Sequence, residues 1–318
     1  MSKFRSVLIV LTCMSLSLAA CGDPDGETEN NSGANNGQNN ETGDCEVECA
    51  EGTVCDADLD HCRVEVQQAQ CNASASSWSA GTTAFEDASA AWKLEDTNPE
   101  GQRISVGDFN GDGRPDLAIR RAGVHRNQFS DGNRAVWLLE NTGTGFEDVT
   151  EESELVQSRV NIDEGRPVDT LVWADVDNDG DQDAYTGFSK TEGSDSVADT
   201  AEIMLNNGDG TFSLTRSDNG ARRAGESDVP GGAAFVDANR DGNIDLWLGQ
   251  GAAGSTVLQD RLLLGNGEGY FEDATESLGL TTEPWRDVQD LNQGLAHTNS
   301  WGAVACDLNG DGTPELLS

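Results

Sequence analysis

Four short segments of the chain share one pattern of oxygen-bearing side chains. In each of them positions 1, 3, 5 and 9 are Asp, Asn or Glu, and position 6 is Gly. Alternate side chains of a tight loop converge on one point, Gly permits the sharp reversal, and the backbone carbonyl of position 7 adds a further oxygen. Calcium takes roughly six to eight such oxygens at about 2.3–2.6 Å. The predicted calcium ligands are Asp108, Asn110, Asp112, Arg114 and Asp116; Asp175, Asp177, Asp179, Asp181 and Asp183; Asp237, Asn239, Asp241, Asn243 and Asp245; and Asp307, Asn309, Asp311, Thr313 and Glu315.

Two other interpretations of these segments stay open: a calcium-binding EF-hand, and acidic turns that bind no metal. An EF-hand or a dockerin-like half of one needs an acidic ligand at position 12 and a helix after it. Position 12 is Ile119, Thr186, Leu248 and Ser318 in the four segments, and the residues after position 9 resemble strands. Solvated acidic turns without a metal are the second alternative. Magnesium fits less well than calcium because it keeps its waters and demands a strict octahedron.

The four segments recur at nearly constant intervals, their first residues being 67, 62 and 70 positions apart. A second motif lies between them, in which a short apolar run leads into an Asn/Gly turn and then an aromatic residue. This order is typical of a β-hairpin. The apolar runs are 136–139, 203–205 and 262–264, and their aromatic residues are Phe146, Phe212 and Phe271. A repeat of this length made of short strands predicts a four-stranded propeller blade.

The repeats of the chain resemble those of a known family. The acidic segments, with flanking residues such as Trp173-Ala174-Asp175, are similar to FG-GAP/VCBS repeats, found in the integrin α-subunit propeller and in many bacterial surface proteins. The resemblance covers roughly residues 80–318, and we expect an all-β propeller domain over 76–318. It implies calcium at the rim of the propeller and use as an interaction scaffold. Glu315 departs from the usual Asp at position 9.

The number of repeats raises a question about closure of the propeller. Family propellers have more blades than the four that the acidic segments mark. We expect an incomplete propeller, truncated at its C-terminal end. The alternative is a small propeller that N-terminal strands close, since Phe85-Glu86-Asp87 matches the end of the hairpin motif.

The first 21 residues predict export and a lipid anchor. Lys3 and Arg5 precede an apolar run over 7–18 that is too short to span a bilayer comfortably. The run ends in Leu18-Ala19-Ala20-Cys21, which resembles the lipobox of bacterial lipoproteins. We therefore expect a signal peptide over 1–20 and lipidation of Cys21, with ordinary secretory cleavage as the alternative. Gly22 favours the outer membrane, since the residue after the cysteine is not the Asp that retains lipoproteins on the inner membrane.

The segments after the anchor predict a tether and then a small disulfide-rich segment. Residues 21–44 hold almost nothing that a core could bury, so we expect a solvated linker. Export implies an oxidising compartment, in which cysteines form disulfides by default. Zinc is the alternative, with His61 as the only histidine nearby. A bridge between Cys71 and Cys306 is a further hypothesis. The disulfide candidates are Cys45, Cys49, Cys55, Cys62 and Cys71, all within 45–71, together with Cys306.

The charge of the chain limits its partners. There are 58 acidic residues against 19 basic ones, a net charge of −39. This excess argues against affinity for nucleic acid and for anionic membrane surfaces, so we expect contact with the membrane through the lipid anchor only.

No catalytic motif was found among the patterns that we considered. The leading hypothesis is a calcium-binding adhesion or ligand-binding scaffold of the cell envelope, for an unknown protein or glycan. A polysaccharide-acting enzyme is the runner-up, with Asp163, Glu164 and Asp169 as its spare carboxylates, and a non-functional fragment is the third possibility. His125 and His297 are interpreted as surface residues. We interpret Trp173, Trp247 and Trp301 as blade core rather than as platforms for a sugar.

Overall fold

The computed structural model describes two separate parts of the chain, which fall in the units Met1–Ala84 and Phe85–Ser318. In the first unit it describes the backbone of strand β1 (Thr53–Asp56), which pairs antiparallel with β2 (His61–Val64). In the second unit it describes residues 86–121, 127–129, 134–160, 164–190, 199–224, 226–285 and 296–318. The predicted signal peptide, the tether and Cys21, Cys45, Cys49 and Cys71 lie outside the described residues.

The second unit is built from three four-stranded antiparallel sheets, each a simple meander. Sheet 1 contains β3 (Arg103–Gly107), β4 (Asp116–Arg120), β5 (Val136–Asn141) and β6 (Phe146–Asp148). Sheet 2 contains β7 (Thr170–Ala174), β8 (Asp183–Gly187), β9 (Glu202–Asn206) and β10 (Phe212–Leu214). Sheet 3 contains β11 (Pro230–Val236), β12 (Asp245–Gln250), β15 (Arg261–Gly265) and β16 (Phe271–Asp273). The apolar runs and hairpins predicted from the sequence are confirmed in all three.

Smaller elements accompany the three sheets. A further antiparallel pair, β19 (Val304–Cys306) and β20 (Glu315–Leu317), repeats the first half of a sheet. A hairpin of β13 (Ala252–Ala253) and β14 (Thr256–Val257) leaves sheet 3, and β17 (Glu283–Pro284) pairs parallel with β18 (Ala296–His297). The helix α1 (Leu94–Thr97) packs near β6. Within the described part of the chain no helix is long and apolar enough to cross a membrane.

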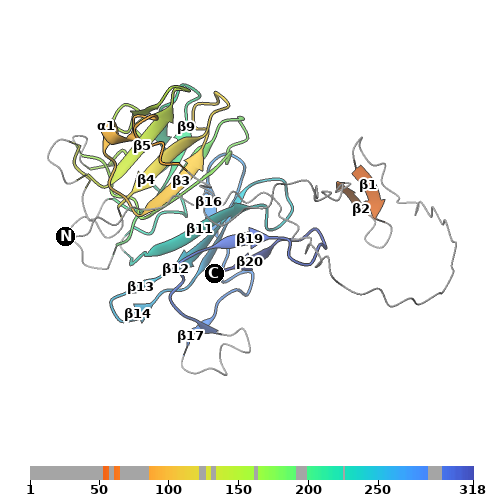
Figure 1. Cartoon of the computed structure of the whole chain (residues 1–318). Helices are drawn as coiled ribbons and strands as arrows, with labels where there is room; N and C mark the ends of the chain where they lie inside the picture. Colours follow the sequence, from red (N-terminus) through yellow and green to blue (C-terminus); the bar gives the residue numbers. More distant parts are fainter. Residues whose placement is uncertain are drawn as a thin grey trace, which may run out of the picture. The chain divides into compact units, whose positions relative to one another are not determined.

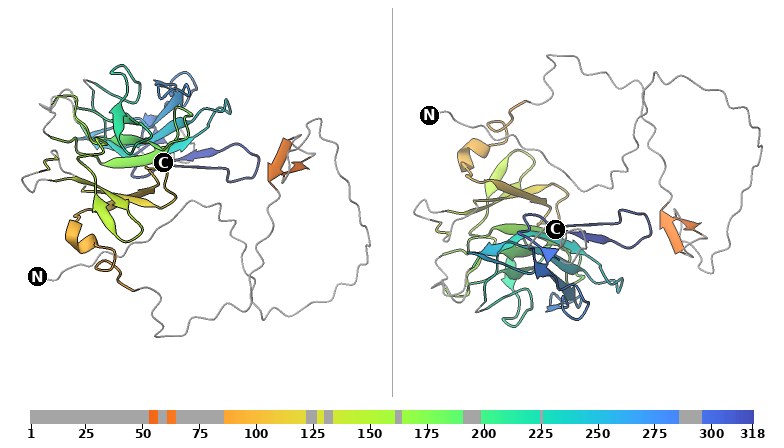
Figure 2. Two further views of the ribbon diagram at one scale, coloured as in Figure 1. Left: turned by 90° about the horizontal axis from the view of Figure 1, so that it is seen from above. Right: turned by 90° about the horizontal axis from the view of Figure 1, so that it is seen from below.

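The first strands of successive sheets lie next to one another (Figure 1). β3 contacts β7, β7 contacts β11, and β11 contacts β19, so the sheets follow one another along an arc (Figure 2). The sheets that the structure describes do not close into a ring. Both flanks of the arc expose apolar side chains, Ile104 and Val106 on β3 at one flank and Val304 and Leu317 at the other.

The core lies between successive sheets. One buried cluster joins sheets 1 and 2 and includes Phe109, Leu138 and Phe212, while a second joins sheets 2 and 3 and includes Tyr185 and Phe271. Every residue of β4, β8 and β12 is buried, because these second strands have a neighbouring layer on both faces. Burial on both faces fits the apolar runs Leu117-Ala118-Ile119 of β4 and Leu246-Trp247-Leu248 of β12, which lack the alternation of a half-exposed strand.

Three predictions about single residues are tested by these contacts. Trp173 packs against Phe212, with ring centroids 6.0 Å apart, and Trp247 is buried, as the blade-core interpretation predicts. Trp301 is 75% exposed, so that interpretation is wrong for this residue in the structure described. Phe85 lies outside the described residues, and the two residues after it form no strand.

Only three of the predicted disulfide cysteines lie among the described residues. The register of the β1–β2 pair makes Cys55 and Cys62 direct cross-strand partners. Cys306 is half-buried on β19 and carries no disulfide within the described part of the chain. Its hypothetical partner, Cys71, lies outside those residues, so the bridge stays a prediction.

Candidate metal centres

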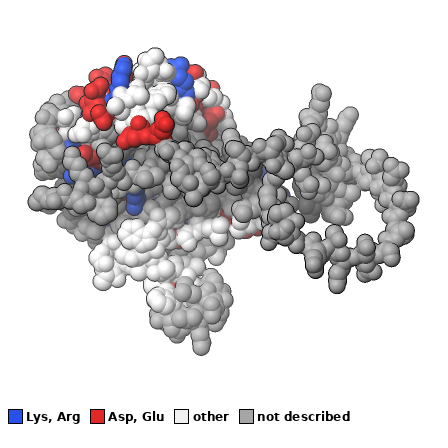
Figure 3. Space-filling model, viewed as in Figure 1, with Lys and Arg blue, Asp and Glu red and all other residues white. Residues whose placement is uncertain are grey.

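All four acidic segments connect the first strand of a sheet to the second, and we call them loops 1 to 4 in chain order. Loop 1 joins β3 to β4, loop 2 joins β7 to β8, loop 3 joins β11 to β12, and loop 4 joins β19 to β20. Since these strands are equivalent and run in the same order in each sheet, the loops emerge at equivalent ends of the sheets. In Figure 3 acidic and basic residues lie side by side over the region of α1 and β3–β5.

Two positions of each loop adopt the left-handed backbone conformation. At position 6 the φ angles are 81° for Gly113, 98° for Gly180, 87° for Gly242 and 78° for Gly312. Position 4 is also left-handed, at Gly111, Asn178, Arg240 and Gly310. The left-handed conformation was predicted from the sequence at position 6 but not at position 4. Gly and Asn at position 4 are the residues that tolerate this conformation best and were the available signal, whereas Arg240 carries the strain of a longer side chain.

The position-1 aspartate folds each loop around its carboxylate. In loop 3 one oxygen of Asp237 accepts a hydrogen bond from the backbone N–H of Asp241 at 3.1 Å, and the other accepts one from Gly242 at 3.0 Å. Asp108, Asp175 and Asp307 make the same two contacts in their own loops. The position-5 carboxylate then accepts from the N–H of position 7 in every loop. The carboxylates of positions 1 and 5 are therefore turned toward the backbone of their own loop in all four.

The position-9 carboxylate is the buried end of each site. In loop 2 one oxygen of Asp183 accepts from the N–H of Val176 and the other from the N–H of Asn206 on the third strand, both at 2.8 Å. Asp116 and Asp245 make the equivalent pairs of contacts in sheets 1 and 3. Position 9 thus fastens the loop to its own sheet.

Loop 4 differs at this position because Glu replaces Asp. One carboxylate oxygen of Glu315 accepts from the N–H of Leu308 at 2.7 Å, as in the other loops. The other oxygen accepts from the side-chain amide of Asn309 at 2.9 Å. The longer side chain of Glu315 keeps the contact within the loop and turns its second oxygen back toward position 3.

Burial makes the position-9 carboxylates of loops 1 to 3 reluctant to ionise. It raises the pKa of Asp116 to about 6 and that of Asp183 to about 7, and it raises the pKa of Asp245 as well. Neighbouring loop carboxylates raise these pKa values further, while the backbone N–H groups lower them. A cation among the carboxylates would relieve both the burial cost and the mutual repulsion.

Loop 2 shows the arrangement that best fits a metal ion. Oxygen atoms of Asp175, Asp177 and Asp183 all lie within 4.8 Å of one another, and this is the one such group among the described residues. Oδ1 of Asp177 is buried and has no hydrogen-bond partner. An unpaired buried carboxylate oxygen is costly, so its presence beside two other carboxylates fits a site that binds a cation.

The other three loops direct some of the same oxygens to neighbouring donors. In loop 1 the guanidinium of Arg114 pairs with Asp112. In loops 3 and 4 the side-chain amide of position 3 donates to the position-5 carboxylate, at 2.9 Å for Asn239 and 3.0 Å for Asn309. In these three loops a hydrogen bond from a side chain of the loop therefore occupies an oxygen of the position-5 carboxylate.

Loops 1 to 3 are also braced by residues of the repeat that follows. The side chain of Gln182 in loop 2 accepts from the N–H of Asp108 in loop 1 at 2.9 Å. The amide of Asn178 donates to the carbonyl of Gly267 in sheet 3, and Arg240 of loop 3 donates to Thr313 of loop 4. The position-2 residues Phe109 and Val176 are buried by the following sheet, whereas Leu308 of loop 4 is 63% exposed.

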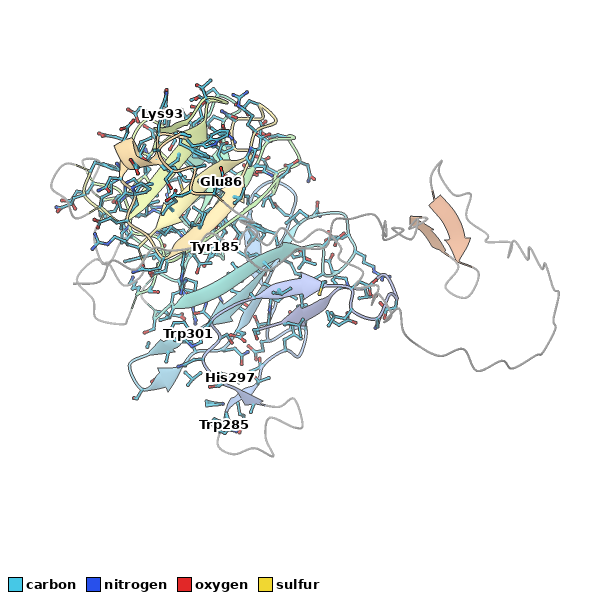
Figure 4. All side chains as sticks on the ribbon, in the orientation of Figure 1. Glu86, Lys93, Tyr185, Trp285, His297 and Trp301 are labelled. Atoms are coloured by element: carbon cyan, nitrogen blue, oxygen red, sulfur yellow. The ribbon has the colours of Figure 1, made fainter. Side chains whose placement is uncertain are left out.

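Two of the spare carboxylates and one histidine have hydrogen-bond partners in the structure. The carboxylate of Glu164 accepts from the amide of Gln128 at 2.8 Å, and that of Asp169 accepts from the N–H of Ser189 at 2.9 Å. His297 lies 2.8 Å from the hydroxyl of Thr282, measured from Nδ1 to Oγ1 (labelled in Figure 4). Asp163 and His125 lie outside the described residues.

Comparison with known proteins bears on the repeat unit. Residues 101–139 match the FG-GAP repeat, and this stretch covers β3, loop 1, β4 and part of β5. No curated protein matches the chain. The matched unit recurs structurally in sheets 2 and 3, where a first strand, an acidic loop, a second strand and a third strand follow in the same order.

Proposed function

We propose that this protein is a calcium-binding β-propeller scaffold of the bacterial cell envelope that binds a ligand and catalyses no reaction. The observation that carries the calcium assignment is the convergence of three carboxylates in loop 2 around an unpaired buried oxygen of Asp177. The FG-GAP repeat at 101–139 supports an integrin-like role in ligand binding or adhesion.

The ion would be held by the loop residues alone. Carboxylate and amide oxygens of positions 1, 3, 5 and 9, with the carbonyl of position 7, form an all-oxygen donor set of the kind that calcium prefers. Bound calcium supplies positive charge that offsets the repulsion among the loop carboxylates. The chain itself fixes the geometry, since position 9 is anchored to the third strand and position 1 to the loop backbone.

Calcium at these loops would stabilise the fold strongly. At about 2 mM free calcium and a dissociation constant near 10⁻⁴ M, each site adds roughly 1.8 kcal/mol to the free energy of unfolding. Four independent sites add about 7 kcal/mol, which is comparable to the whole stability of an ordinary domain. We therefore assign calcium a structural role.

The propeller assignment rests on topology. Three meander sheets follow one another with their first strands adjacent, which is how blades are arranged around a propeller axis. In a closed ring further sheets would cover the flanks of the arc, where Ile104, Val106 and Val304 are exposed. The closed ring of sheets is therefore part of the proposed fold.

The place of the protein in the cell is proposed from its N-terminal sequence. The signal segment and the lipobox-like Leu18-Ala19-Ala20-Cys21 support export and lipidation, and Gly22 supports the outer membrane. Mass spectrometry of the N-terminal peptide, purified from a bacterial host, would find a diacylglyceryl adduct on Cys21. An unmodified Cys21 peptide would contradict the anchor.

The calcium proposal is tested by thermal unfolding of the full chain in excess calcium and in chelator. We expect a large rise of the melting temperature with calcium, which is lost when Asp112, Asp179, Asp241 and Asp311 are all replaced by Ala. The matched control replaces four exposed acidic residues outside the loops, Asp218, Glu268, Glu272 and Glu276, and removes the same charge. An unfolding transition that is indifferent to calcium, or a control that behaves like the loop variant, would contradict the proposal.

A further inference from the structure

A hollow lies at the end of the first strands opposite to the acidic loops. It is lined by the beginnings of β3, β7 and β11 and by residues 301–303, and its volume is about 370 Å³. The loops follow the last residues of these same strands, so the length of a strand separates the two features. Arg103 and Arg120 both line the hollow, one at the start of β3 and the other at the end of β4.

The two arginines are held in place by neutral groups. Nη1 of Arg103 donates to the carbonyl of Asp169 at 2.7 Å and to the hydroxyl of Thr170 at 3.4 Å. Nη1 of Arg120 donates to the hydroxyl of Ser105 at 2.8 Å and to the carbonyl of Leu171 at 3.4 Å. Nε of Arg120 is buried without a partner, and neither guanidinium is paired with a carboxylate of the described residues.

Burying the Arg120 guanidinium without a bound ligand costs the folded protein free energy. Arg120 is 5% exposed, and its burial lowers its pKa to about 9, with the charge of Arg103 acting in the same direction and that of Asp169 against it. The chain has 58 acidic residues to 19 basic ones, yet the residues that line the hollow include these two arginines and no Asp or Glu. A bound anion would supply a counter-charge to the two guanidinium groups.

The walls of the hollow indicate the shape of the ligand. Gly231, Gly232 and Gly302 line it together with the small side chains of Ala233 and Ala303, and the backbone of 300–303 packs directly over Gly231 and Gly232. Trp301, which is labelled in Figure 4, lines the same hollow and is 75% exposed. An exposed indole beside a wall of small residues suits a ring with apolar C–H faces. A planar guanidinium suits a carboxylate, to which it can donate two parallel hydrogen bonds.

We propose that the hollow binds a uronic acid residue of an acidic polysaccharide, with its carboxylate at Arg103 and Arg120 and its ring against Trp301. This inference rests on the proposed binding role and names the class of ligand. It is independent of the calcium loops, which lie at the other end of the strands.

The test is a calorimetric titration of the full chain, in excess calcium, with tetragalacturonate. The neutral comparison is a galactose tetramer, and the peptide comparison is tetraglutamate. We expect saturable binding of tetragalacturonate, at least about tenfold weaker binding of both comparison ligands, and about tenfold weaker binding of tetragalacturonate after Arg103→Gln or Trp301→Ala. A tenfold loss corresponds to about 1.4 kcal/mol. Arg120→Lys should weaken binding as well, because an ammonium cannot donate in the same fork.

Matched controls separate the hollow from general effects of charge and folding. Arg121→Gln removes the charge next to Arg120 from a residue that pairs with Glu100, and Trp285→Ala removes another exposed indole. Both variants should bind tetragalacturonate like the unaltered chain. Absence of binding, equal binding of the neutral tetramer, preference for tetraglutamate, or no effect of Arg103→Gln would overturn the inference. The melting temperature of the same samples is also measured with calcium and with chelator. A rise with calcium would support the calcium-binding scaffold even if the uronic acid proposal fails.

Discussion

The side-chain amide of Asn206, on the third strand of sheet 2, donates a hydrogen bond of 2.6 Å to the carbonyl of Phe109 in loop 1. The same amide donates to the carbonyl of Gln182 in loop 2 at 3.1 Å. One buried side chain therefore holds two acidic loops of successive sheets. The ring of Phe109 packs 6.2 Å from that of Phe212, centroid to centroid, so the base of loop 1 is fixed by sheet 2 as well as by sheet 1.

Replacing Asn206 by Ala should therefore destabilise the protein by about 2 to 3 kcal/mol, because two buried carbonyls lose their donor. Urea unfolding in chelator measures this effect without a contribution from calcium. Asn207→Ala is the matched control, since Asn207 is exposed and hydrogen-bonds within its own turn. Equal stability of the two variants would show that the bridge between the loops is unimportant.

Asp183 should matter for stability even when no metal is bound. Asp183→Ala leaves the buried N–H groups of Val176 and Asn206 without an acceptor, which costs about 3 kcal/mol. Asp181→Ala in the same loop removes a carboxyl group without this loss, and it should have little effect in chelator. Unfolding curves in chelator compare the two variants. If they coincide, position 9 serves only as a ligand.

Glu202 holds together a buried cluster of charges in sheet 2. Its carboxylate is fully buried and pairs with Arg159 at 2.9 Å and with Arg222 at 2.8 Å. Glu202→Gln keeps the volume but removes the buried negative charge with which both guanidinium groups pair, and we expect a loss of about 3 kcal/mol. Asp218→Asn breaks an exposed pair with Arg216 and should have no measurable effect. Chemical denaturation of both variants checks the difference, and a Glu202 variant as stable as the unaltered chain would contradict it.

The pair of Arg134 and Asp148 predicts a dependence of stability on pH. Burial acts to raise the pKa of Asp148, but hydrogen bonds from Arg134 and Thr150 outweigh it and hold this pKa below its ordinary value of 3.8. A lowered pKa in the folded state contributes stability above pH 3.8, which is lost as the pH falls through the lowered value. Asp148→Asn should therefore be less stable than the unaltered chain at pH 7, and the difference should shrink in acid. A difference that is constant from pH 7 to pH 3 would contradict this assignment.

The repeats and their strands could be predicted from the sequence because both depend on local spacing. Alternating oxygens around a glycine mark the loops, and an apolar run before an Asn-Gly turn marks the third strand. The second strands were found from the apolar residues after position 9, such as Leu246-Trp247-Leu248.

Contacts between distant residues could not be predicted in the same way. The role of Asp183 as an acceptor for the third strand depends on a residue 23 positions away, Asn206. Arg103 and Arg120 are cross-strand partners on β3 and β4, but the hollow that they line depends on how three sheets pack side by side. The prediction for Trp301 was wrong because this residue precedes β19 instead of lying within it, and no described layer covers it.

Calcium binding is tested most directly by counting bound ions, through calorimetric titration of the chelator-treated full chain. The account predicts four calcium ions per chain, one for each acidic loop, and three after Asp177→Ala removes the central ligand of loop 2. Asp209→Ala, an exposed carboxylate outside the loops, should leave the number at four. No calcium binding, or a number that Asp177→Ala does not change, would contradict the assignment of the acidic loops as calcium sites.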